Sequence, residues 1–178
     1  MTVIVGVEHR GQVWIGGDSA SIAGETITAR ADEKVFRNGP YLLGFAGSFR
    51  VGQIIRYAFS PPGQVFDDDM QHLCVDFVDA MRVAQREKRA LRRVDEETHE
   101  SDSQFLLGYR GRLYAVDGDY QVERPAELYS AIGVGADFAL GALAATNKKD
   151  PQKRVLAALE ASARHCAGVR GPFVVLRG

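Results

Sequence analysis

The sequence contains little cysteine, no long apolar run and almost no net charge, and each absence excludes a class of protein. Its two cysteines, Cys74 and Cys166, are too few for a disulfide framework and form no metal-ligand pattern, which favours a reducing, cytoplasmic compartment. The formal net charge of −1 gives no electrostatic reason to bind nucleic acid or an anionic membrane. No apolar run approaches the roughly 18 residues that span a bilayer, and no signal peptide is recognisable.

Metal sites are not indicated either. The four histidines show no His-x-x-x-His spacing and no accompanying carboxylate pattern. Residues 67–69 form an acidic run that lacks the spacing of a calcium loop and is more typical of the first turn of a helix. We therefore expect neither a metal ion nor another cofactor.

Apolar periodicity predicts an α+β fold built from antiparallel hairpins and paired helices, with a small-residue loop at 19–24. Strands are predicted at 2–7, 12–15, 25–29, 34–36, 41–46, 104–109, 112–116 and 129–133, and a buried strand is predicted at 173–176. Helices are predicted after Ser48, from Met70 to Ala84, after residues 133–135, and from Asp150-Pro151 onward. This order favours two sheets between two helical layers, in one domain of residues 1–178.

The chemistry is concentrated at the first residues. Removal of Met1 would leave Thr2 with a free α-amino group beside its hydroxyl. Such a residue can act as nucleophile and base at once, because the hydroxyl attacks a carbonyl while the amine takes the proton. An α-amino pKa of roughly 7.7–8.0 suits this task near neutral pH. Many proteins begin with Met-Thr for no catalytic reason, so this pattern needs support from the rest of the chain.

Further short motifs follow this N-terminus in order. They are Thr2–Val7, Gly16-Gly17-Asp18, Lys34, residues 44–48 and residues 131–135. In these motifs and their spacing the chain resembles the proteasome β-subunits and the HslV-type peptidases of the N-terminal-nucleophile hydrolase superfamily. The resemblance reaches from residue 2 to about residue 146, and the spacing is closest to the HslV type.

This resemblance implies a four-layer αββα sandwich that hydrolyses peptide bonds as a threonine-type endopeptidase. It also implies a polypeptide substrate, a homo-oligomeric ring or spiral around a chamber, and an ATP-dependent unfoldase as a candidate partner. Two alternatives stay open. One is an N-terminal-nucleophile amidohydrolase acting on a small amide, and the other is a catalytically silent structural subunit.

The resemblance assigns catalytic roles to Thr2, Asp18, Lys34 and Gly44. Near Thr2, the Lys34 ammonium would lower the pKa of the hydroxyl and of the amine, and Asp18 would be the counter-ion that keeps this lysine charged when desolvated. The N–H of Gly44 would face the tetrahedral intermediate, since no side chain blocks the approach. Taken alone, Lys34 would be a surface lysine, and Gly44 and Gly47 would be turn residues.

The same resemblance gives a substrate side-chain pocket beside the nucleophile. Its lining would be Ser21, Asp32, Leu42 and Ala46. The small Ala46 would leave the pocket open and Leu42 would add an apolar wall, so we expect cleavage after large apolar residues with a broad preference. Asp32 is ambiguous, because it can pair with a basic substrate residue, satisfy Lys34 or point to solvent.

Three positions depart from the family pattern. Val134 stands between two glycines where members commonly carry a serine, so a hydroxyl that assists proton movement is missing. His165 and Gly168 occupy the places of an aspartate and a serine that support the site in proteasome subunits. A thinner polar shell around the nucleophile predicts slow hydrolysis.

We predict that the mature chain begins at Thr2, because methionine aminopeptidases accept a small second residue. The intact mass of the purified protein should therefore correspond to the chain without Met1. Fully active protein that retains this methionine would contradict the role given to the α-amino group.

Overall fold

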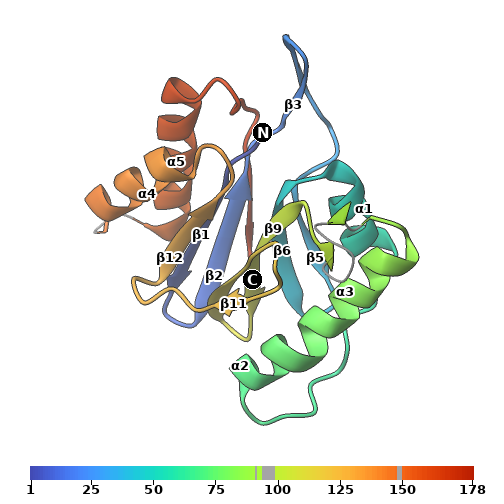
Figure 1. The fold of residues 1–178 in the computed structure, drawn as a ribbon. Helices are drawn as coiled ribbons and strands as arrows, with labels where there is room; N and C mark the ends of the chain where they lie inside the picture. Colours follow the sequence, from blue (N-terminus) through green and yellow to red (C-terminus); the bar gives the residue numbers. More distant parts are fainter. Residues whose placement is uncertain (91, 94–98, 148–149) are drawn as a thin grey trace.

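The computed structural model describes residues 1–90, 92–93, 99–147 and 150–178, and in it two antiparallel sheets lie between two layers of helices (Figure 1). One sheet has the strand order β12–β1–β2–β13, which are Tyr129–Ile132, Ile4–His9, Gln12–Gly17 and Val174–Arg177. The other has the order β11–β10–β9–β6–β5, which are Val122–Glu123, Arg112–Val116, Ser103–Tyr109, Tyr41–Gly47 and Val35–Asn38. The α+β sandwich predicted from the sequence is confirmed.

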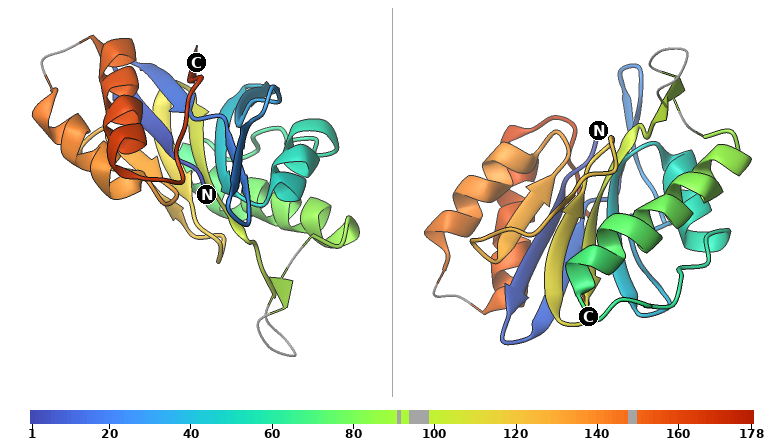
Figure 2. Two further views of the ribbon diagram at one scale, coloured as in Figure 1. Left: turned by 90° about the horizontal axis from the view of Figure 1, so that it is seen from above. Right: turned by 60° about the horizontal axis from the view of Figure 1, so that its bottom comes forward.

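Helices cover the outer face of each sheet, and the view from above in Figure 2 separates the layers. The first sheet is covered by α4 (Ala136–Ala145) and α5 (Pro151–His165). The second is covered by α1 (Phe49–Tyr57), α2 (Asp69–His72), a π-helical turn η1 (Leu73–Phe77) and α3 (Val78–Glu87). The long helix predicted from residue 70 onward is thus one helical stretch with a π-helical middle.

Polar side chains fix where α1 and α5 begin. The Ser48 hydroxyl accepts a hydrogen bond from the N–H of Val51 at 3.4 Å. An Asp150 carboxylate oxygen accepts one from the N–H of Lys153 at 3.2 Å, and Pro151 occupies the first turn. Both N-caps were identifiable in the sequence because Ser and Asp satisfy N–H groups that the helix itself leaves free.

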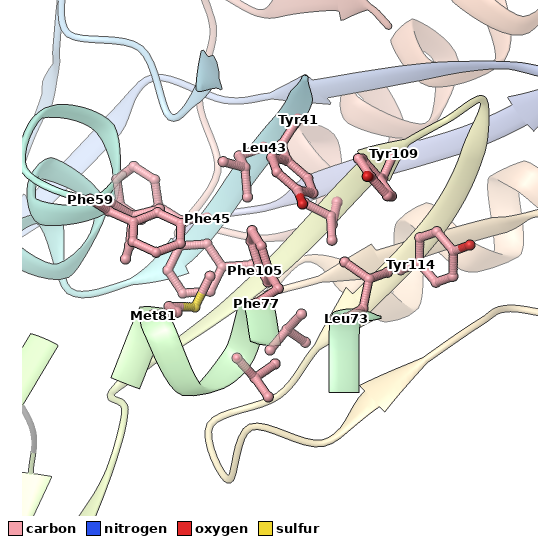
Figure 3. Packing of buried hydrophobic residues seen from close by; sticks show 14 of the residues in the cluster. Tyr41, Leu43, Phe45, Phe59, Leu73, Phe77, Met81, Phe105, Tyr109 and Tyr114 are labelled. Carbon is pink, nitrogen blue, oxygen red and sulfur yellow. The ribbon is translucent and has the colours of Figure 1, made fainter. Parts of the chain in front are cut away.

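Three apolar clusters fill the spaces between the layers. Figure 3 shows the cluster between the second sheet and its helices, where the Tyr41 ring packs on Phe77 at 4.7 Å and on Tyr109 at 4.4 Å between ring centroids. The cluster between the sheets is built from inward-facing strand residues, among them Ile4, Ile15, Val35, Leu42 and Leu106. This inter-sheet layer fixes the distance between the strand ends that carry the polar residues described below.

Two details of the sequence prediction are wrong. The sequence predicts a loop at 19–24, but Ala20–Ala23 forms β3, which pairs with β4 (Thr26–Ala29). Small and polar residues give no clear alternation there, because the hairpin projects beyond the layers and buries little except Ala20 (Figure 1). The last strand, β13, is half-buried rather than buried, since it lies at the edge of its sheet.

A second small hairpin pairs β7 (Arg92–Arg93) with β8 (His99–Glu100). Within the described residues, no helix has the length and apolar character needed to cross a membrane.

Phe77→Ala should strongly destabilise the fold. Its side chain is 0% exposed and packs against the rings of Tyr41 and Phe59, so truncation leaves a cavity that costs about 3–5 kcal/mol of unfolding free energy. Val75→Ala is the matched control, because Val75 lies in the same π-helical turn but is 44% exposed. Urea unfolding should separate the two variants, and equal losses would contradict the packing described.

Candidate active site

A lysine ammonium, a threonine hydroxyl and a carboxylate meet at one end of the two sheets. Thr2 precedes β1, Asp18 follows β2 and Lys34 precedes β5, so both sheets contribute. Lys34 Nζ donates hydrogen bonds to Thr2 Oγ1 at 2.8 Å and to Asp18 Oδ1 at 2.9 Å. The side chains of Lys34 and Asp18 are 1% and 0% exposed. The structure thus brings together three of the four residues to which the sequence assigns catalysis.

The Asp18 carboxylate is held from four directions. Besides the Lys34 ammonium, its Oδ1 accepts from the N–H of Val3 at 3.1 Å, and its Oδ2 accepts from the N–H groups of Ala20 at 2.9 Å and Arg170 at 3.4 Å. A buried charge is tolerated when it is paired and its remaining lone pairs are satisfied. The carboxylate is therefore fixed by three backbone segments, and it fixes the lysine in turn.

Burial changes the acidity of the lysine. Desolvation lowers the pKa of Lys34 below the ordinary lysine value, the Asp18 charge and hydrogen bond oppose that change, and the nearby Arg30 guanidinium adds to the lowering. A lysine in this setting reaches its neutral form at a lower pH than a solvated one. It can therefore accept a proton from the hydroxyl that it contacts.

Met1 covers the Thr2 hydroxyl in this structure. The Thr2 hydroxyl donates to the Met1 carbonyl at 2.5 Å, and Thr2 itself is 2% exposed whereas Met1 is 63% exposed. The nitrogen of Thr2 is here a peptide nitrogen and not an amine. Loss of Met1 would both uncover the hydroxyl and create the amine beside it.

A cleft of about 380 Å³ opens directly at Thr2. Its lining comes from the N-terminus, the turn after β12, the end of β6, the start of β9 and Gly118. Its lining is Met1, Thr2, Ala46, Gly47, Ser101, Asp102, Ser103, Gln104, Gly118, Gly133 and Val134. Residues 101–104 and Gly118 were missed in the sequence, where nothing marks them as near residue 2 in space.

Of the four residues expected in the substrate pocket, the cleft contains only Ala46. Leu42 is 1% exposed and belongs to the cluster between the sheets. Ser21 lies on the projecting hairpin, in β3. Asp32 pairs with Arg30, with distances of 2.8 Å to Nε and 2.5 Å to Nη2, and not with Lys34. The apolar wall attributed to Leu42 is therefore absent from the cleft.

Gly44 and Gly47, near the end of β6, are glycines for different structural reasons. Gly44 lies within the strand opposite Val35, and a Cβ there would approach Ile4 Cγ2 to 2.5 Å and Ile15 Cγ2 to 2.9 Å. Gly44 therefore permits the two sheets to pack, and it lies next to the lysine without lining the cleft. Gly47 does line the cleft, with a φ of +127° that favours glycine.

The turn after β12 is anchored both to the nucleophile and to α5. The N–H of Gly135 donates to the Thr2 carbonyl at 3.4 Å, and the Ser162 hydroxyl donates to the Gly135 carbonyl at 2.9 Å. Val134, in the middle of this turn, is 49% exposed and lines the cleft. The position where family members commonly carry a serine is thus beside the nucleophile, and here it is apolar.

The two C-terminal departures are placed differently. Gly168 lies against Met1, since a Cβ on it would approach Met1 Cβ to 2.7 Å. His165 instead packs on the ring of Phe138, with ring centroids 5.7 Å apart. In the part of the chain that the structure describes, no group of three or more His, Cys, Asp or Glu side chains is placed to hold a metal ion.

Comparison with known proteins finds relatives that span most of this chain. The chain is 26% identical over 144 residues to the ATP-dependent protease subunit HslV of Oceanobacillus iheyensis, which covers 79% of this chain and 74% of that protein. It is 25% identical over 171 residues to the ATP-dependent protease subunit HslV of Brevibacillus brevis, which covers 94% of this chain and 89% of that protein. The chain is thus similar to ATP-dependent protease subunits of the HslV type. No protein-family model matches it.

A solved structure shares the fold of this chain. Thiobacillus denitrificans BPH in complex with epoxomicin superposes with a TM-score of 0.83 at 20% identity, covering 99% of this chain and 97% of that one. The similarity to HslV-type peptidases that the sequence indicates, and the fold that it implies, are therefore confirmed.

Asp18→Asn should destabilise the fold by about 3–5 kcal/mol, because it leaves the buried Lys34 ammonium without its counter-ion. The double variant Asp18→Asn, Lys34→Met removes both charges and should cost less than the sum of the single changes. Urea unfolding of the three variants measures this coupling. Strictly additive losses would contradict a direct charge pair.

Proposed function

We propose that this chain is a threonine-type endopeptidase of the HslV type, which hydrolyses peptide bonds with Thr2 as its nucleophile after removal of Met1. The observation that carries the proposal is the hydrogen bond of 2.8 Å from the Lys34 ammonium to the Thr2 hydroxyl, inside a buried and charge-balanced site. The relatives named above are protease subunits, which supports the same reading.

The mechanism follows from the contacts around the hydroxyl. Thr2 Oγ1 attacks the carbonyl carbon of the substrate, and its proton passes to the α-amino group or to Lys34 Nζ. Collapse of the tetrahedral intermediate breaks the C–N bond, and the leaving amine takes that proton. Water then hydrolyses the acyl ester and regenerates the hydroxyl. By resemblance to the family, the N–H of Gly44 is proposed to stabilise the oxyanion, although Gly44 itself does not line the cleft.

The substrate proposed is an unfolded polypeptide, held in the cleft at Thr2. Ala46 and Val134 give this cleft apolar surface, whereas Ser103 and Gln104 give it polar surface. Such a mixed lining supports broad cleavage after large apolar residues, because an apolar contact discriminates by only about 1–3 kcal/mol per methylene.

We further propose that the protein acts in the cytoplasm as a single domain that assembles into a homo-oligomeric ring or spiral. Exposed apolar side chains support assembly: Tyr57 on α1 is 73% exposed, and Phe138 and Leu140 on α4 are 43% and 37% exposed. An ATP-dependent unfoldase is the proposed partner, because the relatives are named as subunits of ATP-dependent proteases.

Thr2→Ala should abolish hydrolysis and leave the fold intact, because the variant loses only the attacking hydroxyl. Thr28→Ala is the matched control, since Thr28 is exposed on the projecting hairpin. Hydrolysis of short fluorogenic peptides and of an unfolded protein is measured for both variants, with circular dichroism as the check on folding. An active Thr2→Ala protein would rule out the proposed nucleophile.

Substrate length separates this proposal from an amidohydrolase. Cleavage of the unfolded protein supports a peptidase, and cleavage of small amides alone would contradict it. An inert wild-type protein that lacks Met1 would favour a silent subunit.

A further inference from the structure

Two cations of this chain share one aromatic ring next to the nucleophile. Phe49 is the first residue of α1, and the Lys34 Nζ lies 5.6 Å from the centroid of its ring. The guanidinium carbon of Arg30 lies 4.1 Å from the same centroid. Arg30 comes from the segment between β4 and β5, so a side chain that no catalytic motif includes reaches the surroundings of the site.

The guanidinium is held in place by two independent contacts. Its Nε and Nη2 donate to the two carboxylate oxygens of Asp32 at 2.8 Å and 2.5 Å, a bidentate arrangement that fixes the plane of the group. Packing on the Phe49 ring fixes its position along the other direction. The Arg30 side chain is 30% exposed, so water screens its charge only in part.

The charges that face Lys34 come from three places. Asp18 contacts its ammonium directly and favours the charged form, and the Thr2 amine would lie beside it once Met1 is removed. Arg30 is a second positive charge, and like charges disfavour ionisation of each other. Consistent with this geometry, Arg30 contributes to the lowered pKa of Lys34, after the larger effect of burial.

We propose that Arg30 is a positioning residue that holds a positive charge beside Lys34 across the Phe49 ring and so favours the neutral amine that accepts the Thr2 proton. The inference rests on the proposed peptidase function. In the step concerned, the proton of Thr2 Oγ1 moves to Lys34 Nζ as the oxygen bonds to the substrate carbon. Asp32 acts on Lys34 in the opposite sense, because it partly neutralises Arg30.

Arg56 provides a matched control. Its guanidinium also packs on an aromatic ring, at 5.5 Å from the centroid of Phe36, and lies near a carboxylate, with Glu33 at 3.9 Å. Its side chain is 27% exposed, close to the value for Arg30. Arg56 is not among the groups that change the pKa of Lys34.

The test is the pH dependence of kcat/KM for a fluorogenic peptide in Arg30→Gln, Asp32→Asn and Arg56→Gln. Loss of the Arg30 charge makes Lys34 harder to deprotonate, so the acidic limb should move to higher pH by on the order of half a pH unit. Asp32→Asn should move the limb to lower pH, and Arg56→Gln should leave it unchanged. Arg30→Lys should restore most of the wild-type profile. Misfolding cannot produce limb shifts of opposite sign.

A second readout does not need activity. Because the folded chain holds Lys34 with a lowered pKa, its unfolding free energy rises with pH between that value and the ordinary lysine pKa. In Arg30→Gln this rise should be smaller than in Arg56→Gln. A wild-type protein without hydrolysis would refute the peptidase function, and the stability profile would still decide whether Arg30 acts on Lys34. Identical profiles for Arg30→Gln and Arg56→Gln would overturn the inference.

Discussion

The rest of the site depends on the burial of one ammonium group, that of Lys34. A lysine with 1% of its side chain exposed is costly unless a counter-ion meets it, and Asp18 does so at 2.9 Å. The carboxylate needs partners of its own, and these are N–H groups of Val3, Ala20 and Arg170. The two sheet ends and the C-terminal segment are thereby tied together around one pair of charges. The Thr2 hydroxyl also accepts a hydrogen bond from the Lys34 ammonium.

The same arrangement explains why small residues surround the nucleophile. A Cβ on Gly133 would approach the Thr2 carbonyl oxygen to 2.4 Å, and one on Gly135 would approach Val3 Cβ to 3.0 Å. Side chains at either position would push the turn away from the first strand. Close backbone approach therefore lets the turn form one wall of the cleft, while Val134 between them faces that cleft.

Much of this could be predicted from the sequence, because it depends on local order along the chain. The hairpins, the caps at Ser48 and Asp150, and the spacing of Thr2, Asp18 and Lys34 follow from residue types and their separation. These features can be recognised in the sequence because each is determined by neighbouring residues, or by strand ends that must meet once the two sheets pack.

Other features could not be predicted, because they depend on which way a strand turns its side chains. Leu42 and Ala46 both face the space between the sheets. Only Ala46 is near enough to the end of β6 to reach the cleft. Gln104 reaches the cleft through the pairing of β9 with β6, which no local pattern reveals. The Arg30–Asp32 pair settles the ambiguity over Asp32, and the Arg30 guanidinium also packs on the ring of Phe49, which is distant in the sequence.

A free Thr2 next to Lys34 is the proposed nucleophile, and covalent labelling tests this role. The protein is treated with a peptide epoxyketone, an electrophile that can react with a hydroxyl and an adjacent amine, and the modified peptide is identified by mass spectrometry. We expect one adduct per chain, on the peptide that begins with Thr2, and none in Lys34→Met. An adduct on any other residue, or on a peptide that still carries Met1, would contradict it.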